Sequence, residues 1–298
     1  MVINNLTIDS GGQDMTLQVM AAIDGSGYSA GVCDFAVWAS QTLEAPLRFV
    51  HVVDKQPRTP ELDLSGSIGL GAREHLLERL VQLDEERARI AQEQGWLMLE
   101  AALERAREVG AGELAIDQRN GTLVDVLGEL QHDMRLLVIG MRGETAHQAS
   151  NHLGSNLERV VRALYRPILV VPTVFKRPEK VMMAFDGSKT MCRAVELLAA
   201  SPLVRNLPVH VVMVGAESKE NRSQLDWAIQ LLREAGHDSC GAILGGDVET
   251  SLRAYKEEQG IGLLVMGAYG HSRIRHLLVG STTTEMLRQA SVPVLLLR

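Results

Sequence analysis

The stretch "VMAAIDGS" at residues 19–26 recurs as "VMMAFDGS" at residues 181–188. An apolar run that ends in Asp-Gly-Ser is typical of a buried strand followed by a turn. Because further matches follow in the same order, the chain contains an internal repeat. The other matching pairs are "LRFVHVVD" (47–54) with "LPVHVVMV" (207–214), "LLVIGMRG" (136–143) with "LLVMGAYG" (263–270), and "YRPILVVP" (165–172) with "SVPVLLLR" (291–298).

This repeat predicts two copies of one domain, at residues 1–173 and 178–298. They are joined near "PTVFKRPE" (172–179), where prolines and charges suit a linker. The first copy is longer, because a loop and a long helical pattern over 73–109 follow its second strand. We expect the charged residues over 78–94 to face solvent. The apolar side of this helix must be covered by its own sheet or by another subunit.

Each copy alternates short apolar runs with segments of helical period, which predicts an α/β fold. The runs are apolar on both faces, as in buried parallel strands. With right-handed crossovers, each copy becomes an open, doubly wound, parallel five-stranded sheet of Rossmann-like type, in the order 3-2-1-4-5. We expect the fifth strands, "PILVV" (167–171) and "PVLLL" (293–297), to contact each other in an intrachain pseudo-dimer, with a homodimer as a further assembly.

Composition excludes several classes of protein. The 298 residues have a net charge of -7, which argues against a nucleic-acid partner. No apolar run approaches the roughly 18 residues of a membrane span, so we expect a cytoplasmic protein without one. The three cysteines, Cys33, Cys192 and Cys240, lie far apart, which predicts buried thiols in a reducing compartment and neither a disulfide nor a zinc site.

The strand order predicts where a ligand binds. Its winding reverses between strands 1 and 4, and ligands bind beside such a reversal, at the carboxyl ends of the strands. Glycines there allow close approach of the backbone, and a helix start offers N–H groups to phosphates. We therefore expect a nucleotide, with Asp186 accepting from its ribose or adenine. The expected binding residues of the second copy are Asp186, Gly187, Val214, Gly267, Gly270, Arg273, Gly280, Ser281 and Thr282.

The second-copy loop has a recognisable spacing. Gly267 and Gly270 are separated by two residues, and nine residues then precede Gly280-Ser281. At these residues the chain resembles the universal stress protein family in its tandem two-domain form. The resemblance implies ATP binding, with the strand-1 aspartate near the adenosine and the loop around the phosphates. We expect Mg to accompany the ATP phosphates, with few protein ligands. It also implies a cytoplasmic protein linked to stress survival and, in many members, no established catalytic turnover.

The first copy departs from this spacing, because ten residues separate Gly143 from Gly154. Its loop carries Glu144 and lacks counterparts of the second-copy arginines, although Arg142 lies between its first two glycines. We therefore expect the nucleotide mainly in the second copy, and binding in the first copy stays open. The corresponding residues are Asp24, Gly140, Gly143, Gly154 and Ser155.

Two alternatives remain. Gly25, Gly27 and Asp54 outline a dinucleotide-binding fingerprint, which would hold NAD, but the second copy lacks the second of these glycines. A slow ATPase or another nucleotide-using enzyme on the same fold is the other alternative. No set of residues in the sequence predicts a catalytic centre or a protein-ligated metal site.

Overall fold

The computed structural model describes residues 6–8, 14–54, 70–143, 155–268 and 281–298. A short antiparallel pair, β1 (Leu6–Ile8) and β2 (Asp14–Thr16), precedes the main sheet. The first half then contains β3 (Gln18–Ala22), α1 (Ser29–Leu43), β4 (Leu47–Val53), α2 (Leu70–Glu108), β5 (Leu114–Asn120), α3 (Leu123–Leu130), β6 (Met134–Gly140), α4 (Ser155–Ala163) and β7 (Ile168–Val171). The second contains β8 (Val181–Ala184), α5 (Lys189–Ala199), β9 (Val209–Val214), α6 (Lys219–Glu234), β10 (Ser239–Leu244), α7 (Val248–Gln259), β11 (Leu263–Gly267), α8 (Ser281–Arg288) and β12 (Val294–Leu297).

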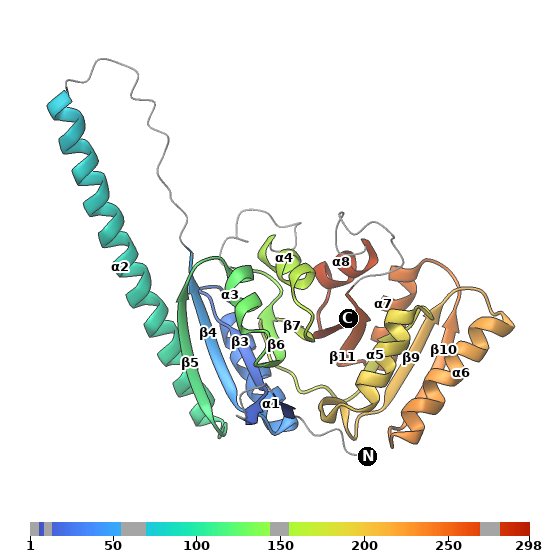
Figure 1. Cartoon of the computed structure of the whole chain (residues 1–298). Helices are drawn as coiled ribbons and strands as arrows, with labels where there is room; N and C mark the ends of the chain where they lie inside the picture. The colour runs from blue at the N-terminus through green and yellow to red at the C-terminus, as the bar shows by residue number, and fades with distance from the viewer. Residues whose placement is uncertain (1–5, 9–13, 55–69, 144–154, 269–280) are drawn as a thin grey trace.

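Ten strands form one sheet in the order β10-β9-β8-β11-β12-β7-β6-β3-β4-β5 (Figure 1). Within each half the neighbours are parallel and the order is 3-2-1-4-5, so the predicted α/β fold class is confirmed. At the centre, β7 and β12 pair antiparallel, with Leu169 opposite Leu295. The expected contact between the fifth strands is therefore present, and it makes one continuous sheet of the two expected ones.

Helices cover both faces of this sheet, which explains its apolar strands. In β6, Leu136 and Val138 point into one core, whereas Leu137 and Ile139 point into the other. Residues of α1, α2, α5 and α6 line the first core, and residues of α3, α4, α7 and α8 line the second. Because successive side chains of a strand face opposite ways, a strand between two cores must be apolar throughout.

Helix α2 confirms the long helix predicted over 73–109. Its C-terminal part packs on the sheet, where Gly95 permits close approach: a Cβ there would lie 2.5 Å from Cδ2 of His51. Arg105 adds a bidentate ion pair with Asp34 of α1, at 2.7 Å for each bond. The N-terminal part of α2 extends beyond the body of the molecule (Figure 1).

The segment between the halves is packed against the first half. Phe175 contacts Phe35 of α1 edge to face, with ring centroids 4.7 Å apart. Gly31 lies so close to the chain after β7 that a Cβ there would be 2.2 Å from the carbonyl oxygen of Pro172. A direct polar contact also joins the two halves. Arg298, after β12 of the second half, donates hydrogen bonds to the carbonyl oxygen of Leu164 at 2.9 Å and to that of Arg162 at 3.0 Å, both in the first half.

The cysteines differ in burial, and the expectation of three buried thiols was wrong for one of them. Cys33 is buried, and this burial, with the neighbouring Asp34 carboxylate, raises the pKa of its thiol to about 12. Cys192 is half-buried. Cys240 is exposed because it lies on β10, at the outer edge of the sheet. In the part of the chain that the structure describes, no helix combines the length and apolar character needed to cross a membrane.

Candidate functional site

In the first half, the structure brings together the strand-1 aspartate and the second glycine of the strand-4 loop. Asp24 follows β3, and its Oδ1 accepts a hydrogen bond from the backbone N–H of Ser26 at 3.0 Å. The other oxygen, Oδ2, lies beside Gly143, where a Cβ would be 3.2 Å away. Two residues that are far apart in the sequence thus meet at the carboxyl edge of the sheet, at the winding reversal.

Tyr28 covers the first glycine of the same loop. A Cβ on Gly140 would lie 2.7 Å from the Cβ of Tyr28, so the tyrosine stem lies directly over the end of β6. Sequence reasoning did not single out Tyr28, because an aromatic residue before a helix carries no signal for such a contact. The close contact between Gly140 and Tyr28 can therefore be seen only in the structure.

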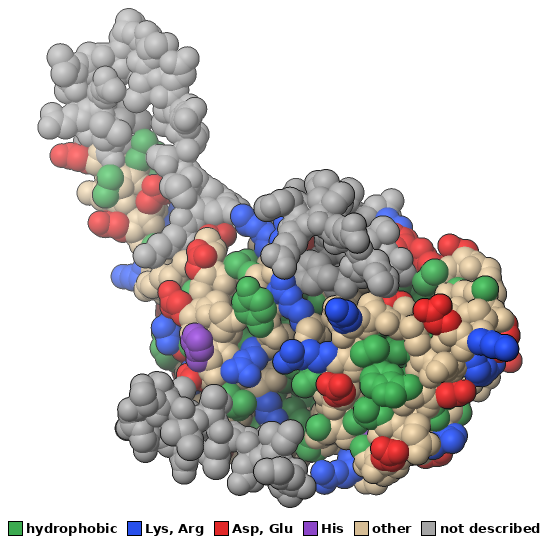
Figure 2. Space-filling view, turned by 45° about the vertical axis from the view of Figure 1, so that its right-hand side comes forward, with side chains coloured by type: hydrophobic (Ala, Val, Ile, Leu, Met, Phe, Trp, Pro, Cys, Tyr) green, Lys and Arg blue, Asp and Glu red, His purple; other side chains and the backbone are tan. Residues whose placement is uncertain are grey.

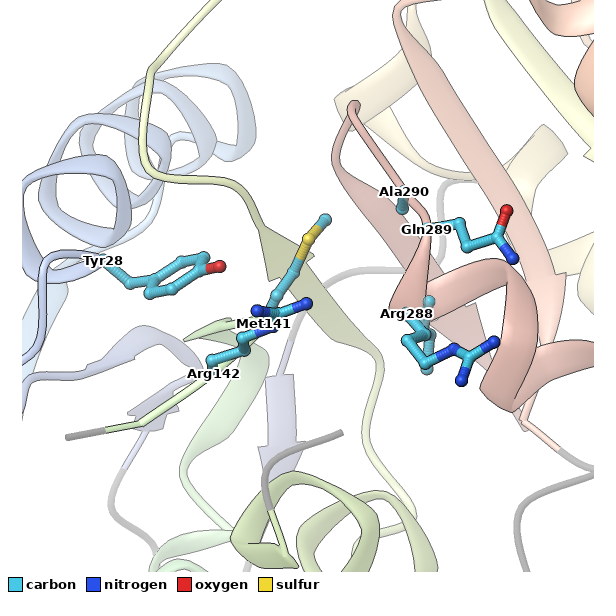
Figure 3. Close-up of a pocket in the computed structure, with 7 residues that line it drawn as sticks. Tyr28, Met141, Arg142, Arg288, Gln289 and Ala290 are labelled. Atoms are coloured by element: carbon cyan, nitrogen blue, oxygen red, sulfur yellow. The ribbon is translucent and has the colours of Figure 1, made fainter. Parts of the chain in front are cut away.

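A cavity of about 230 Å³ opens beside these residues, between the two halves (Figure 3). Tyr28, Met141 and Arg142 line it from the first half, and the end of α8 with the residues after it, 287–290, lines it from the second. Arg142 is half-buried there. The cavity therefore lies at the junction of the two halves, with one arginine from each half, Arg142 and Arg288, on its wall.

In the second half, Asp186 follows β8 and is exposed. Its Oδ1 accepts a hydrogen bond from the backbone N–H of Ser188 at 2.9 Å. Gly187 has a φ of +69°, a left-handed conformation that favours glycine. A Cβ on Gly187 would lie 1.9 Å from Oε1 of Gln224, a side chain of α6. Sequence reasoning missed Gln224, because a glutamine on a charged helix looks like any solvated residue.

The end of β11 is tied to the start of α8. The hydroxyl of Thr283, which is buried, donates a hydrogen bond to the carbonyl oxygen of Gly267 at 3.3 Å. This bond holds the first turn of α8 at the carboxyl end of β11. The sequence suggested Ser281 and Thr282 as the hydroxyls of this turn, and the structure shows that they begin α8. It adds Thr283, which sequence reasoning had not distinguished from its neighbours.

The remaining predicted residues lie in other places. Val214 ends β9 at the same edge of the sheet and pairs with Leu244 of β10. Ser155 begins α4. Four of the predicted binding residues lie outside the described residues: Gly154, Gly270, Arg273 and Gly280.

Among the described residues of the second-half crevice, Cys192 is not an activated nucleophile. The Sγ of Cys192 lies 3.8 Å from the carbonyl oxygen of Gly187. Burial raises the pKa of this thiol, and the carboxylates of Asp186 and Glu196 raise it further. Cys192 therefore keeps its proton at neutral pH. Within the described ranges, no group of three His, Cys, Asp or Glu residues is arranged to hold a metal ion.

Comparisons with known proteins identify the family and the fold of this chain. The model of the universal stress protein family matches residues 15–172 and 213–298. A universal stress protein of Synechocystis, Slr1230, is 37% identical over 284 residues, which cover 94% of this chain and 99% of the relative.

Among solved structures, a universal stress protein from Archaeoglobus fulgidus DSM 4304 covers 94% of this chain and 98% of its own, with a TM-score of 0.67 and 17% identity, and it shares the fold. Another structure, of the Archaeoglobus fulgidus universal stress protein in complex with dAMP, covers 40% of this chain and 97% of its own at 22% identity, with a TM-score of only 0.33. The family match and the near full-length relative decide the assignment: the chain belongs to the universal stress protein family.

Proposed function

We propose that this chain is a cytoplasmic stress-response protein that binds ATP with Mg and regulates through occupancy rather than turnover. The observation that carries the proposal is the proximity of Asp24 Oδ2 to Gly143 at the winding reversal, because both halves repeat these residues in sequence. A carboxylate beside a glycine backbone at this edge can hold a nucleoside hydroxyl or amine while the loop approaches the phosphates. In the repeat, Asp186 and Gly270 are the corresponding residues of the second half, and Gly270 lies outside the described residues.

We propose that the second half holds the nucleotide more tightly. In the first half, the space over Gly140 is filled by the Cβ of Tyr28, which cannot swing away without moving the backbone. In the second half, the nearest atom to the equivalent position on Gly267 is Sδ of Met191, at 3.0 Å. A methionine end is flexible and can make room for a ligand.

The residues of the second half suit the two ends of ATP. The Asp186 carboxylate is exposed and has capacity beyond the bond from Ser188, so it can accept from a ribose hydroxyl or the adenine amine. The N-terminal turn of α8, fixed by Thr283 to the end of β11, can donate backbone N–H groups to the phosphates. Magnesium would offset the phosphate charge while using few protein ligands.

We further propose that residues 1–173 and 178–298 are two domains that form an intrachain pseudo-dimer. The antiparallel pairing of β7 with β12 supports this arrangement, because each half contributes the same strand. The bonds from Arg298 to the end of α4 add a polar contact at the junction.

Calorimetric titration of the intact chain with MgATP tests the proposal. We expect one tight site, and Asp186→Ala should weaken it by roughly 5- to 150-fold, since losing one hydrogen bond to a charged group costs about 1–3 kcal/mol. Asp24→Ala is the matched control and should leave that site intact. The opposite pattern would assign the tight site to the first half, and two unaffected variants would exclude both crevices. If the protein released phosphate at a steady rate at saturating ATP, it would be an ATPase, and the proposal of a regulatory binder without turnover would be wrong.

A further inference from the structure

Helix α2 carries an apolar stripe that faces solvent, which begins in the part beyond the body and ends where the helix packs on the sheet. Leu83, Ile90 and Leu97 are 43%, 46% and 61% exposed, and each is seven positions from the next. A spacing of seven places side chains on one line of a helix, as in the seam of a coiled coil. The stripe covers about 20 Å of helix, at about 1.5 Å per residue.

This stripe lies opposite the face of α2 that packs on the body. Leu99, Ala102 and Ala106 are buried against the sheet and α1. Leu97 is two positions from Leu99, about 200° around the helix at about 100° per residue. A helix from another molecule could therefore lie along the stripe without contacting the body of the chain to which this α2 belongs.

Residues 81–90 are all exposed, so this segment of α2 has no tertiary packing within the described residues. Figures 1 and 2 show the same segment standing clear of the folded halves, with apolar and charged side chains next to each other on its surface. Isolated helical segments of this length are marginal in water, because most helix stability in proteins comes from packing of an apolar face. An exposed stripe of large aliphatic residues on such a segment is typical of a contact surface.

We propose that the α2 helices of two copies of this chain pair in parallel along this stripe, forming a two-stranded coiled coil that makes the protein a homodimer. In the heptad notation abcdefg, Leu83, Ile90 and Leu97 occupy d, and Leu80, Arg87 and Gln94 occupy a. Arg87 and Gln94 make two of these three a positions polar, and a polar residue at a single a position is known to fix register and the number of strands at a cost in stability.

The charges beside the stripe favour the parallel arrangement. In a parallel pair, a g residue faces the e residue five positions later on the other helix. By this rule Arg79 of one copy lies opposite Asp84 of the other. Two-fold symmetry gives a second, equivalent pair of opposite charges. Glu86, also at g, lies next to Arg87 at a across the seam. An antiparallel pair in the register that aligns the stripes would instead bring Glu86 against Glu93.

A second copy suits this surface better than it suits the middle of the sheet. The edges of β7 and β12 pair with each other inside one chain, so neither is available to another molecule. The counterpart of α2 in the second half is α6, which lies between the second and third strands and has 16 residues against the 39 of α2. The proposed dimer therefore depends on the insertion in the first half and does not depend on nucleotide binding.

Sedimentation equilibrium of the full chain over a range of concentrations tests the proposal. We expect a mass twice that of the chain, and Leu83→Glu/Ile90→Glu should give a monomer at concentrations where the wild type is dimeric. The control is Gln82→Glu/Ala88→Glu, which adds the same charge at exposed positions off the seam and should remain dimeric. A monomeric wild type, or two variants that dimerise equally well, would overturn the proposal.

Charge reversal tests the pairing without introducing charge into the stripe. Asp84→Arg should weaken the dimer, and Arg79→Glu/Asp84→Arg should restore it, because the opposed charges are exchanged. Failure of the double variant to recover would overturn the assigned register. Leu97→Cys in a Cys240→Ser background should form a cross-linked dimer on mild oxidation, since like d positions meet only in the parallel arrangement. Absence of the cross-link in a dimeric sample would reject that orientation.

Discussion

Replacement of Gly187 by alanine should destabilise the second half through two separable effects. The φ of +69° costs an L-residue about 1–2 kcal/mol. The new methyl group would also lie 1.9 Å from Oε1 of Gln224, which must then leave its position. Because that oxygen is at the end of a flexible side chain, the added cost is about one strained rotamer, roughly 1 kcal/mol. We therefore expect a total loss of about 2–3 kcal/mol.

Two variants separate these effects when the free energy of unfolding is measured in urea. Gly236→Ala has a φ of +90° and nothing within 4 Å of the added methyl, so it should show the conformational cost alone. Gln224→Ala removes the obstructing side chain, and the double variant with Gly187→Ala should recover the difference. If Gly187→Ala is as stable as the wild type, the left-handed turn after Asp186 is wrong. An equal loss with and without Gln224 would show that the glutamine does not lie over the glycine.

Three further predictions concern packing and pH. Gly31→Ala should lower the free energy of unfolding by at least about 2 kcal/mol, because its methyl would meet the carbonyl oxygen of Pro172 at 2.2 Å; in matched thermal scans, Gly128→Ala, with free space around it in α3, should instead gain up to about 1 kcal/mol of helix propensity. Burial lowers the pKa of His210 below its ordinary value, so the unfolded chain binds this proton more readily than the folded one. The contribution of His210 to the free energy of unfolding is therefore full above about pH 6.5 and falls as the pH drops below it. In urea titrations His210→Gln should reduce that fall, and an unchanged fall would exclude His210 as its cause. Arg298→Ala should cost about 1–2 kcal/mol and open the junction to limited proteolysis, while equal protease resistance in the variant would show that these bonds do not hold the halves together.

The sequence was sufficient for the inner strands such as β6, β7, β11 and β12, because they lie between two apolar cores and are largely apolar. The order 3-2-1-4-5 followed from the repeat and from crossover handedness. The contact of β7 with β12 was predictable as well, since two apolar edge strands must be covered. The long helix α2 was visible in its periodicity, and its observed limits, Leu70–Glu108, differ from the expected ones by only a few residues.

Residues that act through tertiary contacts could not be predicted. Tyr28 and Gln224 matter because of what lies opposite them, a glycine in each case, and neither has a local signal. Thr283 is one of three consecutive threonines, and only the direction of its hydroxyl toward Gly267 distinguishes it. Cys240 was misjudged because burial was inferred from the number and spacing of the cysteines, although the predicted strand order already placed its strand, β10, at the edge of the sheet.

The antiparallel join at the centre of the sheet has a consequence for biosynthesis. All five strands of the first half leave the ribosome before any of the second, and β12 is the last strand of this sheet to be made. Until β12 has been made and has paired, β7 therefore presents an open, wholly apolar edge, which is a template for aggregation. The last strand of the sheet to be synthesised thus closes its middle, so protection of this adhesive edge waits for the whole second half.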